Sequence, residues 1–226
     1  MTSRNSSWKS DFAAGASGPE TEEIKRTTES GKFKGPIPLL PAGKDYLWGG
    51  RRLRDDFSKD IPLTPLAETW ECSTHPDGLS LLAEDPDKTL HELLQENPWM
   101  FGTHPAKSMP EAVKKGELPV LIKFIDAAAD LSVQVHPDDA YAREHENGQL
   151  GKSEMWYVVD AAPGAKLVYG FSHDMDRERV REAAQNGTLE KHLQRVPIRK
   201  DDVFFIPAGT VHAIGGGSLI AEVQES

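Results

Sequence analysis

The chain has 226 residues and a formal net charge of −10 at pH 7. This negative charge argues against nucleic acid or an anionic membrane as a partner, since both carry the same sign. The sequence has no apolar run long enough to span a bilayer, and its first residues lack the apolar core of a signal peptide. The single cysteine, Cys72, cannot form an internal disulfide, which is typical of a reducing compartment. We therefore expect a cytoplasmic protein without nucleic-acid or membrane partners.

The first 35 residues differ in composition from the rest. They are rich in Ser, Thr, Glu, Lys and Gly, and their few apolar residues follow no period. Such a segment cannot bury enough surface to offset the entropy that it loses on ordering. We therefore predict a disordered extension over residues 1–35 and a folded domain over residues 36–226.

Helical patterns occur at four places in the predicted domain. Three leucines at helical spacing predict a helix over Thr89–Glu96, and a second short helix, interrupted by Pro110 near its start, is predicted over Lys107–Lys115. Asp138 is placed to cap a third helix rather than to bind a ligand. A polar helix over Asp176–Asn186 is expected to end at Gly187.

Short strand patterns, separated by Gly and Pro, account for most of the remaining domain. They cover Val120–Ile125, Ala165–Phe171, Asp202–Pro207 and Ser218–Gln224. Strands of this kind with helices inserted between them predict a mainly β barrel or sandwich. Lys123 is the one charge within the first of these strands, and burying it unpaired is costly. Its ammonium is therefore expected either to reach the surface or to end in a polar pocket.

The segment from Leu131 to Tyr157 carries the strongest functional pattern. Its beginning alternates like a half-buried strand, with Val133 and Val135 on one face and Gln134 and His136 on the other. Further along, Lys152 and Glu154 are two residues apart, so they share a face of a later strand.

A third motif, far downstream, complements these two. The Pro207–Gly209 turn follows an apolar strand and places His212 at the start of the next one. An amide, a carboxylate and two imidazoles on stiff strands suit a divalent metal such as zinc. We predict that Gln134, His136, Glu154 and His212 form a four-ligand metal site with positions open for a substrate.

In this sequence the motifs read Gln-x-His, a carboxylate 18 residues after His136, and Pro-x-Gly-x-x-His. Their spacing resembles the metal motif of the cupin barrel. The longer strings LIKFIDAAADLSVQVHPDD, GKSEMWYVV and DDVFFIPAGTVHAIGGGSLIAEVQES resemble class I mannose-6-phosphate isomerase (phosphomannose isomerase) in its short bacterial form. The resemblance covers roughly residues 36–226. It implies a mainly β fold, the cupin (jelly-roll) β-barrel with helical insertions.

The resemblance also implies a function and a set of roles. It implies one Zn²⁺ per chain and an aldose–ketose isomerase that interconverts mannose 6-phosphate and fructose 6-phosphate through an enediol. The family has glutamine at the position of Gln134, where other cupins usually have histidine. The implied catalytic residues are Lys152 and Glu222, and the implied substrate-binding residues are Lys123, Trp48 and Arg51. Two of these have simpler alternatives, because Glu222 also suits a solvated edge strand and Arg51 also suits a surface arginine pair.

Two departures keep two other functions open: Gln134 stands where other cupins usually have histidine, and the sequence ends short of a segment that the family has. In the family, the strand of Glu222 continues into a Tyr-Arg segment whose arginine helps the chemistry, and a smaller second β-domain is present. Here the sequence ends at Ser226, so we expect either a fragment or a divergent remnant with an unpaired sheet edge. A sugar-phosphate-binding cupin without catalysis is one alternative. An iron-dependent cupin oxygenase that uses His136, Glu154 and His212 is the other.

Overall fold

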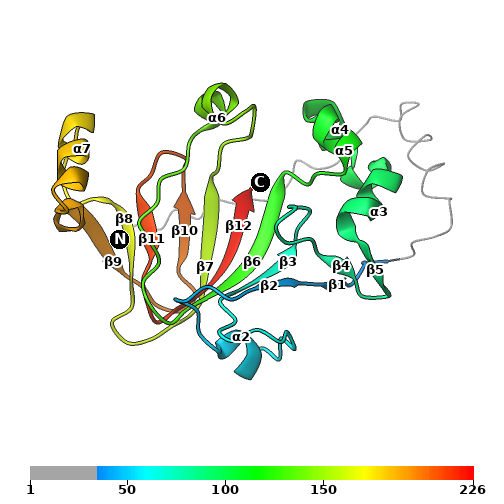
Figure 1. The fold of residues 1–226 in the computed structure, drawn as a ribbon, viewed down its shortest axis with the longest axis horizontal. Helices are drawn as coiled ribbons and strands as arrows, with labels where there is room; N and C mark the ends of the chain where they lie inside the picture. Colours follow the sequence, from blue (N-terminus) through cyan, green and yellow to red (C-terminus); the bar gives the residue numbers. More distant parts are fainter. Residues whose placement is uncertain (1–34) are drawn as a thin grey trace, which may run out of the picture. The chain divides into compact units, whose positions relative to one another are not determined.

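The largest sheet is built around two long antiparallel strands, β6 (Val120–Ala127) and β12 (Ser218–Glu225), which pair over their full length. β7 (Glu154–Ala161) flanks β12 on its other side, and β10 (Val203–Ile206) forms one edge. The remaining strands, beyond β6, are β3 (Glu68–Cys72) and then β2 (Ala42–Lys44) (Figure 1).

This computed structural model describes residues 35–226. The predicted disordered extension therefore lies, except for its last residue, outside the described residues.

The two faces of this sheet are chemically different. Residues two apart share a face, so Ile125, Trp156 and Ile220 point to the same side as Lys123, Glu154 and Glu222. We call this side the inner face. All six side chains on it are buried, with 9% or less of each residue exposed. One half of the inner face is therefore apolar and the other half is charged.

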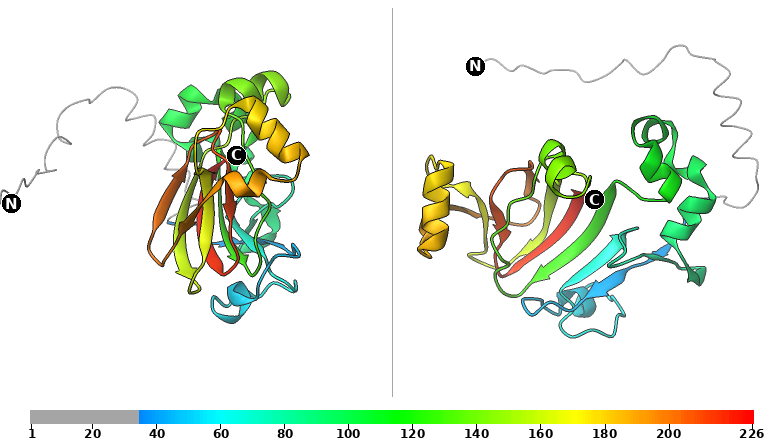
Figure 2. Two further views of the ribbon diagram at one scale, coloured as in Figure 1. Left: turned by 90° about the vertical axis from the view of Figure 1, so that its left-hand side faces the viewer. Right: turned by 45° about the horizontal axis from the view of Figure 1, so that its top comes forward.

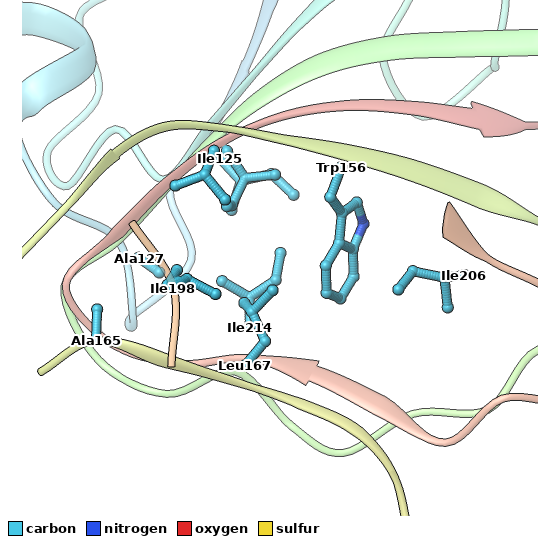
Figure 3. Close-up of a cluster of buried hydrophobic side chains, with 10 residues drawn as sticks. Ile125, Ala127, Trp156, Ala165, Leu167, Ile198, Ile206 and Ile214 are labelled. Carbon is cyan, nitrogen blue, oxygen red and sulfur yellow. The ribbon is translucent and has the colours of Figure 1, made fainter. Parts of the chain in front are cut away.

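A second sheet covers the apolar half of the inner face. It contains β11 (His212–Ile214), β8 (Lys166–Phe171) and β9 (Leu193–Pro197), in that order. Side chains from both sheets form the main core, with Trp156 pointing between them (Figure 3). The members of this core are Ile125, Ala127, Trp156, Val158, Ala165, Leu167, Ile198, Ile206, Ile214 and Ile220.

A helical insertion follows a small third sheet of β1 (Leu39–Leu40), β4 (Leu81–Leu82) and β5 (Asp85–Thr89). The predicted helix is confirmed as α3 (Leu90–Glu96), and Thr89 and Glu92 form a capping box at its start. The predicted interruption at Pro110 is confirmed, but the segment predicted as one short helix over Lys107–Lys115 belongs to two helices. The chain instead forms α4 (Thr103–Ser108) and α5 (Pro110–Lys115), because Pro110 lacks an N–H and starts a new helix.

The predicted cap at Asp138 is confirmed. The Asp138 side chain accepts a hydrogen bond from the Tyr141 N–H at the start of α6 (Asp139–His145). Asp176 does the same for α7 (Arg177–Gln185). The short remaining helices are α2 (Arg52–Asp55), η1 (Pro98–Phe101) and η2 (Leu189–His192). None of the helices in residues 35–226 has the length and apolarity that crossing a membrane requires.

The mainly β class with helical insertions is confirmed, but the predicted barrel is not closed. The strands within the described part of the chain form three separate sheets, and β10 pairs only with β7. The predicted strand at Leu131–His136 is also wrong, since Gln134 makes only an isolated bridge to His212. Val133 and Val135 are 37% and 58% exposed, so their alternation does not reflect a buried face.

The core in Figure 3 predicts a large effect for Ile125→Ala. Ile125 is 2% exposed at the junction of the two sheets, and truncation there leaves a cavity. We expect the free energy of unfolding to fall by about 2–5 kcal/mol, measured by urea denaturation. Val203→Ala is the control, because Val203 is 63% exposed and its loss should change stability by less than about 0.5 kcal/mol. Equal effects of the two substitutions would contradict this assignment of the core.

Candidate metal centre

Three of the four predicted ligands come together at the charged half of the inner face. The ligand atoms of His136, Glu154 and His212 all lie within 4.8 Å of one another. One oxygen of Glu154 lies 3.2 Å from His136 Nε2, and the other lies 3.7 Å from His212 Nε2. Two imidazoles and a carboxylate in this arrangement form a typical donor set for a divalent transition metal.

These three residues come from separate segments of the chain, and backbone contacts hold the segments together. Glu154 is the first residue of β7, and His212 is the first residue of β11. The N–H of Gly209 donates to the His136 carbonyl at 2.8 Å, which ties the Pro207–Gly209 turn to the first ligand segment. Gly209 has φ +84°, a left-handed conformation that glycine adopts without strain. The predicted turn therefore brings two distant histidines together.

His212 is oriented for metal binding by its second ring nitrogen. Its Nδ1–H donates to the Thr210 carbonyl at 2.8 Å, which leaves the Nε2 lone pair directed towards Glu154. Burial lowers the pKa of His212 below its ordinary value, although the Thr210 carbonyl and Glu154 act in the opposite direction. The imidazole is therefore neutral at physiological pH, as a ligand must be.

Gln134 is joined to His212 through the backbone. The two residues exchange N–H···O hydrogen bonds of 2.9 Å each, so their side chains leave the bridge on the same side. The Gln134 side chain is exposed, and its Nε2 donates to Ser132 Oγ at 3.3 Å. Its role as the fourth ligand stays a prediction.

Glu154 is an ionised carboxylate surrounded by donors. Its side chain is 2% exposed, and Lys152 Nζ donates to Oε1 at 2.7 Å. Burial alone raises the pKa of a carboxyl group, but contacts with His136 and Lys152 outweigh it and lower the pKa of Glu154 to about 2. Lys152 Nζ also lies 3.3 Å from His136 Nε2, so the predicted catalytic lysine touches two predicted ligands.

Trp156 connects Glu154 to the second predicted acid, Glu222. Its indole N–H lies 2.9 Å from Glu154 Oε2 and 2.7 Å from Glu222 Oε2, so it donates to both carboxylates. Glu222 is 3% exposed, so it lies inside the protein and not on a solvated strand. Burial raises the pKa of Glu222, while Lys123 acts in the opposite direction.

Lys123 ends in a polar pocket, which decides between its two predicted alternatives. Its Nζ lies 3.1 Å from Glu222 Oε1 and 3.6 Å from Glu68 Oε2, with 11% of the side chain exposed. Burial lowers the pKa of Lys123, but Glu222 and Glu68 reverse this effect and raise it above its ordinary value. The ammonium is therefore charged and paired.

The sequence interpretation assigned no role to Glu68, Trp70, Trp156 or Gln224. A signal for the first three is the repeated Glu-x-Trp pattern, because residues two apart on a strand share a face. In both copies, Glu68–Trp70 and Glu154–Trp156, the indole N–H donates to the carboxylate, at 2.7 Å and 2.9 Å.

The other two predicted substrate residues lie outside this cluster. The Arg51 side chain is 70% exposed and faces Asp55 at 3.4 Å. Trp48 is partly buried against the main core, and its ring stacks on Tyr46 with 5.4 Å between centroids. Neither residue lines the cleft described next, so their proposed substrate contacts stay predictions.

A cleft of about 1060 Å³ opens next to the candidate metal centre. β12 ends between α6 on one side and α4 with α5 on the other (Figures 1 and 2). Residues of α4, α5, β12 and the segment 146–152 that follows α6 line the cleft. His136, Lys152 and Gln224 form part of its wall. The metal-ligand cluster therefore has access to a space that can hold a small molecule.

Comparison with known proteins assigns the family. The model of the phosphomannose isomerase type I catalytic domain matches residues 37–161, which is more than half of the chain. The chain belongs to this family. Its similarity to a solved mannose 6-phosphate isomerase from Bacillus subtilis has a TM-score of 0.75, with 38% identity over 85% of this chain and 59% of that one. This match confirms the cupin class of the fold.

Curated relatives agree with this assignment. A probable mannose-6-phosphate isomerase of Bacillus subtilis is 39% identical over 193 residues, which are 84% of this chain and 58% of that protein. A mannose-6-phosphate isomerase of Streptococcus mutans is 42% identical over the same shares of both chains. The chain thus spans less than two thirds of the length of these relatives.

The lowered pKa of Glu154 predicts how its substitution changes acid stability. A carboxylate whose pKa falls from 4.5 to about 2 on folding stabilises the protein above pH 4.5, and this contribution is lost as the pH drops towards 2. Glu154→Gln removes that titration. We therefore expect the metal-free variant to show a shallower decline of unfolding free energy between pH 5 and pH 3, measured by urea denaturation at each pH. The same slope in both proteins would show that Glu154 is not held ionised by its neighbours.

Proposed function

We propose that this chain carries the catalytic site of a zinc-dependent mannose-6-phosphate isomerase, which interconverts mannose 6-phosphate and fructose 6-phosphate through an enediol. The observation that carries the proposal is the contact of Lys152 with both His136 and Glu154 at the edge of the cleft. It places a proton-carrying group beside a metal-ligand set, and that combination suits proton transfer next to a carbonyl. Membership of the family supports the same reaction.

The donor set fits zinc. Two imidazole nitrogens and a carboxylate are typical zinc ligands, and Gln134 is the proposed fourth. When bound there, zinc would stabilise the negative charge that develops on the sugar oxygens during enolisation. The Lys152 ammonium now shares Glu154 Oε1, so we expect it to turn towards the cleft when a cation is bound.

Lys152 is the proposed carrier of the proton between C2 and C1 of the sugar. Its side chain is 25% exposed and lines the cleft, so a bound sugar can reach it.

Glu222 and Lys123 are proposed to hold the sugar from the inner side. Glu222 is buried, and its Oε2 is fixed by the Trp156 N–H. Lys123 Nζ faces the opposite oxygen, Oε1, at 3.1 Å. This pair presents one donor and one acceptor to sugar hydroxyls in a region of low dielectric, where hydrogen bonds are strong.

Metal removal tests the proposed reaction. Chelation should abolish conversion of mannose 6-phosphate to fructose 6-phosphate, and one equivalent of Zn²⁺ per chain should restore it. His212→Ala should bind zinc much more weakly, whereas the exposed His104→Ala should behave as the parent protein. Zinc-dependent sugar-phosphate binding without turnover would support a non-catalytic binding protein instead. Oxygen consumption with Fe²⁺ would support the oxygenase.

The role of Lys152 is tested by Lys152→Met. The variant should keep its zinc and lose turnover by about 10²–10⁴-fold, because general acid–base catalysis typically contributes this much. Lys166→Met is the matched control, since Lys166 is exposed on β8. Normal turnover with full zinc occupancy would exclude Lys152 as the proton carrier. Joint loss of zinc and turnover would mean that Lys152 supports the ligands instead.

A further inference from the structure

Gln224 carries a buried polar atom that has no hydrogen-bond partner among residues 35–226. The residue is 8% exposed on β12, and its Oε1 makes no hydrogen bond. The other end of the amide is satisfied, because Nε2 donates to the Glu225 carbonyl at 3.1 Å. A buried carbonyl oxygen without a donor destabilises the folded state, so a residue of this kind requires an explanation.

The hydrogen bond of Nε2 fixes which end of the amide is free. If the amide were turned over, Oε1 would face the Glu225 carbonyl and two acceptors would meet. The free end of the side chain is therefore the acceptor. It requires a donor from outside the described residues 35–226.

The position of Gln224 shows where that donor can come from. Gln224 lies opposite Glu154 in the pairing of β12 with β7, and it shares the inner face with Glu222 two residues away. Its side chain lines the cleft together with His136 and Lys152. The free oxygen therefore lies beside the proposed reaction site, in the same wall as the proposed proton carrier.

We propose that Gln224 Oε1 accepts a hydrogen bond from a hydroxyl group of the bound sugar and positions that sugar along β12. This inference rests on the function proposed above. A phosphate at neutral pH offers mainly acceptor oxygens, so Gln224 Oε1 would bind a hydroxyl group of the sugar and not its phosphate. A neutral amide also adds no charge beside Glu154 and Glu222, whereas a third carboxylate would repel both.

The substitution Gln224→Met separates this role from a structural one. Methionine has a similar length and no polar end, so it removes the unpaired oxygen without leaving a large cavity. In the zinc-loaded protein without sugar, we expect the thermal midpoint to stay equal or to rise. We expect the dissociation constant for mannose 6-phosphate, measured by calorimetry, to increase about tenfold. Gln194→Met on β9 is the control, because Gln194 is exposed and should change neither quantity.

Inorganic phosphate is the second probe. Its inhibition of mannose 6-phosphate binding should be the same in the parent protein and in Gln224→Met. Equal sugar-phosphate affinity in the two proteins overturns the inference alone, and so does a clear drop in the thermal midpoint of the variant. If the zinc-loaded parent protein binds no mannose 6-phosphate, the proposed function is overturned together with the inference.

Discussion

The charged half of the inner face depends on one shared hydrogen-bond donor, the indole N–H of Trp156. It holds the carboxylates of Glu154 and Glu222 at 2.9 Å and 2.7 Å, although two negative charges so close repel each other. Each carboxylate is balanced on its far side by a lysine, Lys152 for Glu154 and Lys123 for Glu222. Because Trp156 is 1% exposed and packed in the main core, the position of both acids follows from the packing of the two sheets.

This arrangement explains why a chain can bury so many charges. An isolated buried carboxylate is costly, and the cost falls only when each oxygen has a donor or a cation. The rest of this cost is offset by apolar burial on the same strands. Ile125 and Ile220 lie on the same face as Lys123 and Glu222 and pack in the main core. Stability and chemistry are therefore divided along the length of each strand rather than between separate domains.

The sequence predicted the clustering of three candidate ligands better than it predicted the strands. His136, Glu154 and His212 follow from local rules, namely spacing on a strand and a Pro–Gly turn, and the structure brings them together. The strand at 131–136 was wrong because alternating valines do not show whether a partner covers them. The hydrogen bond from Trp156 to Glu222 joins β7 to β12 between residues that lie 66 positions apart in the sequence. No pattern within a short segment predicts such a contact.

The neighbouring residues Arg51 and Arg52 are a second case in which a local sequence pattern does not predict the contacts. The sequence alone does not distinguish the roles of Arg51 and Arg52. The structure does, because the Asp126 carboxylate binds Arg52. Arg52 gives Asp126 both its backbone N–H at 2.7 Å and its side-chain Nε–H at 2.8 Å, and Asp126 is 1% exposed. A Cβ on Gly50 would lie 2.1 Å from Asp126 Oδ2, so only glycine lets the loop approach this closely. The contact fixes the loop that contains Gly50 at the Ala127 end of β6. Lys123 lies four residues before Ala127 on the same strand. The exposed arginine, Arg51, therefore lies at the Ala127 end of β6, away from Lys123, whereas Lys152 in the cleft wall comes from the segment just before β7.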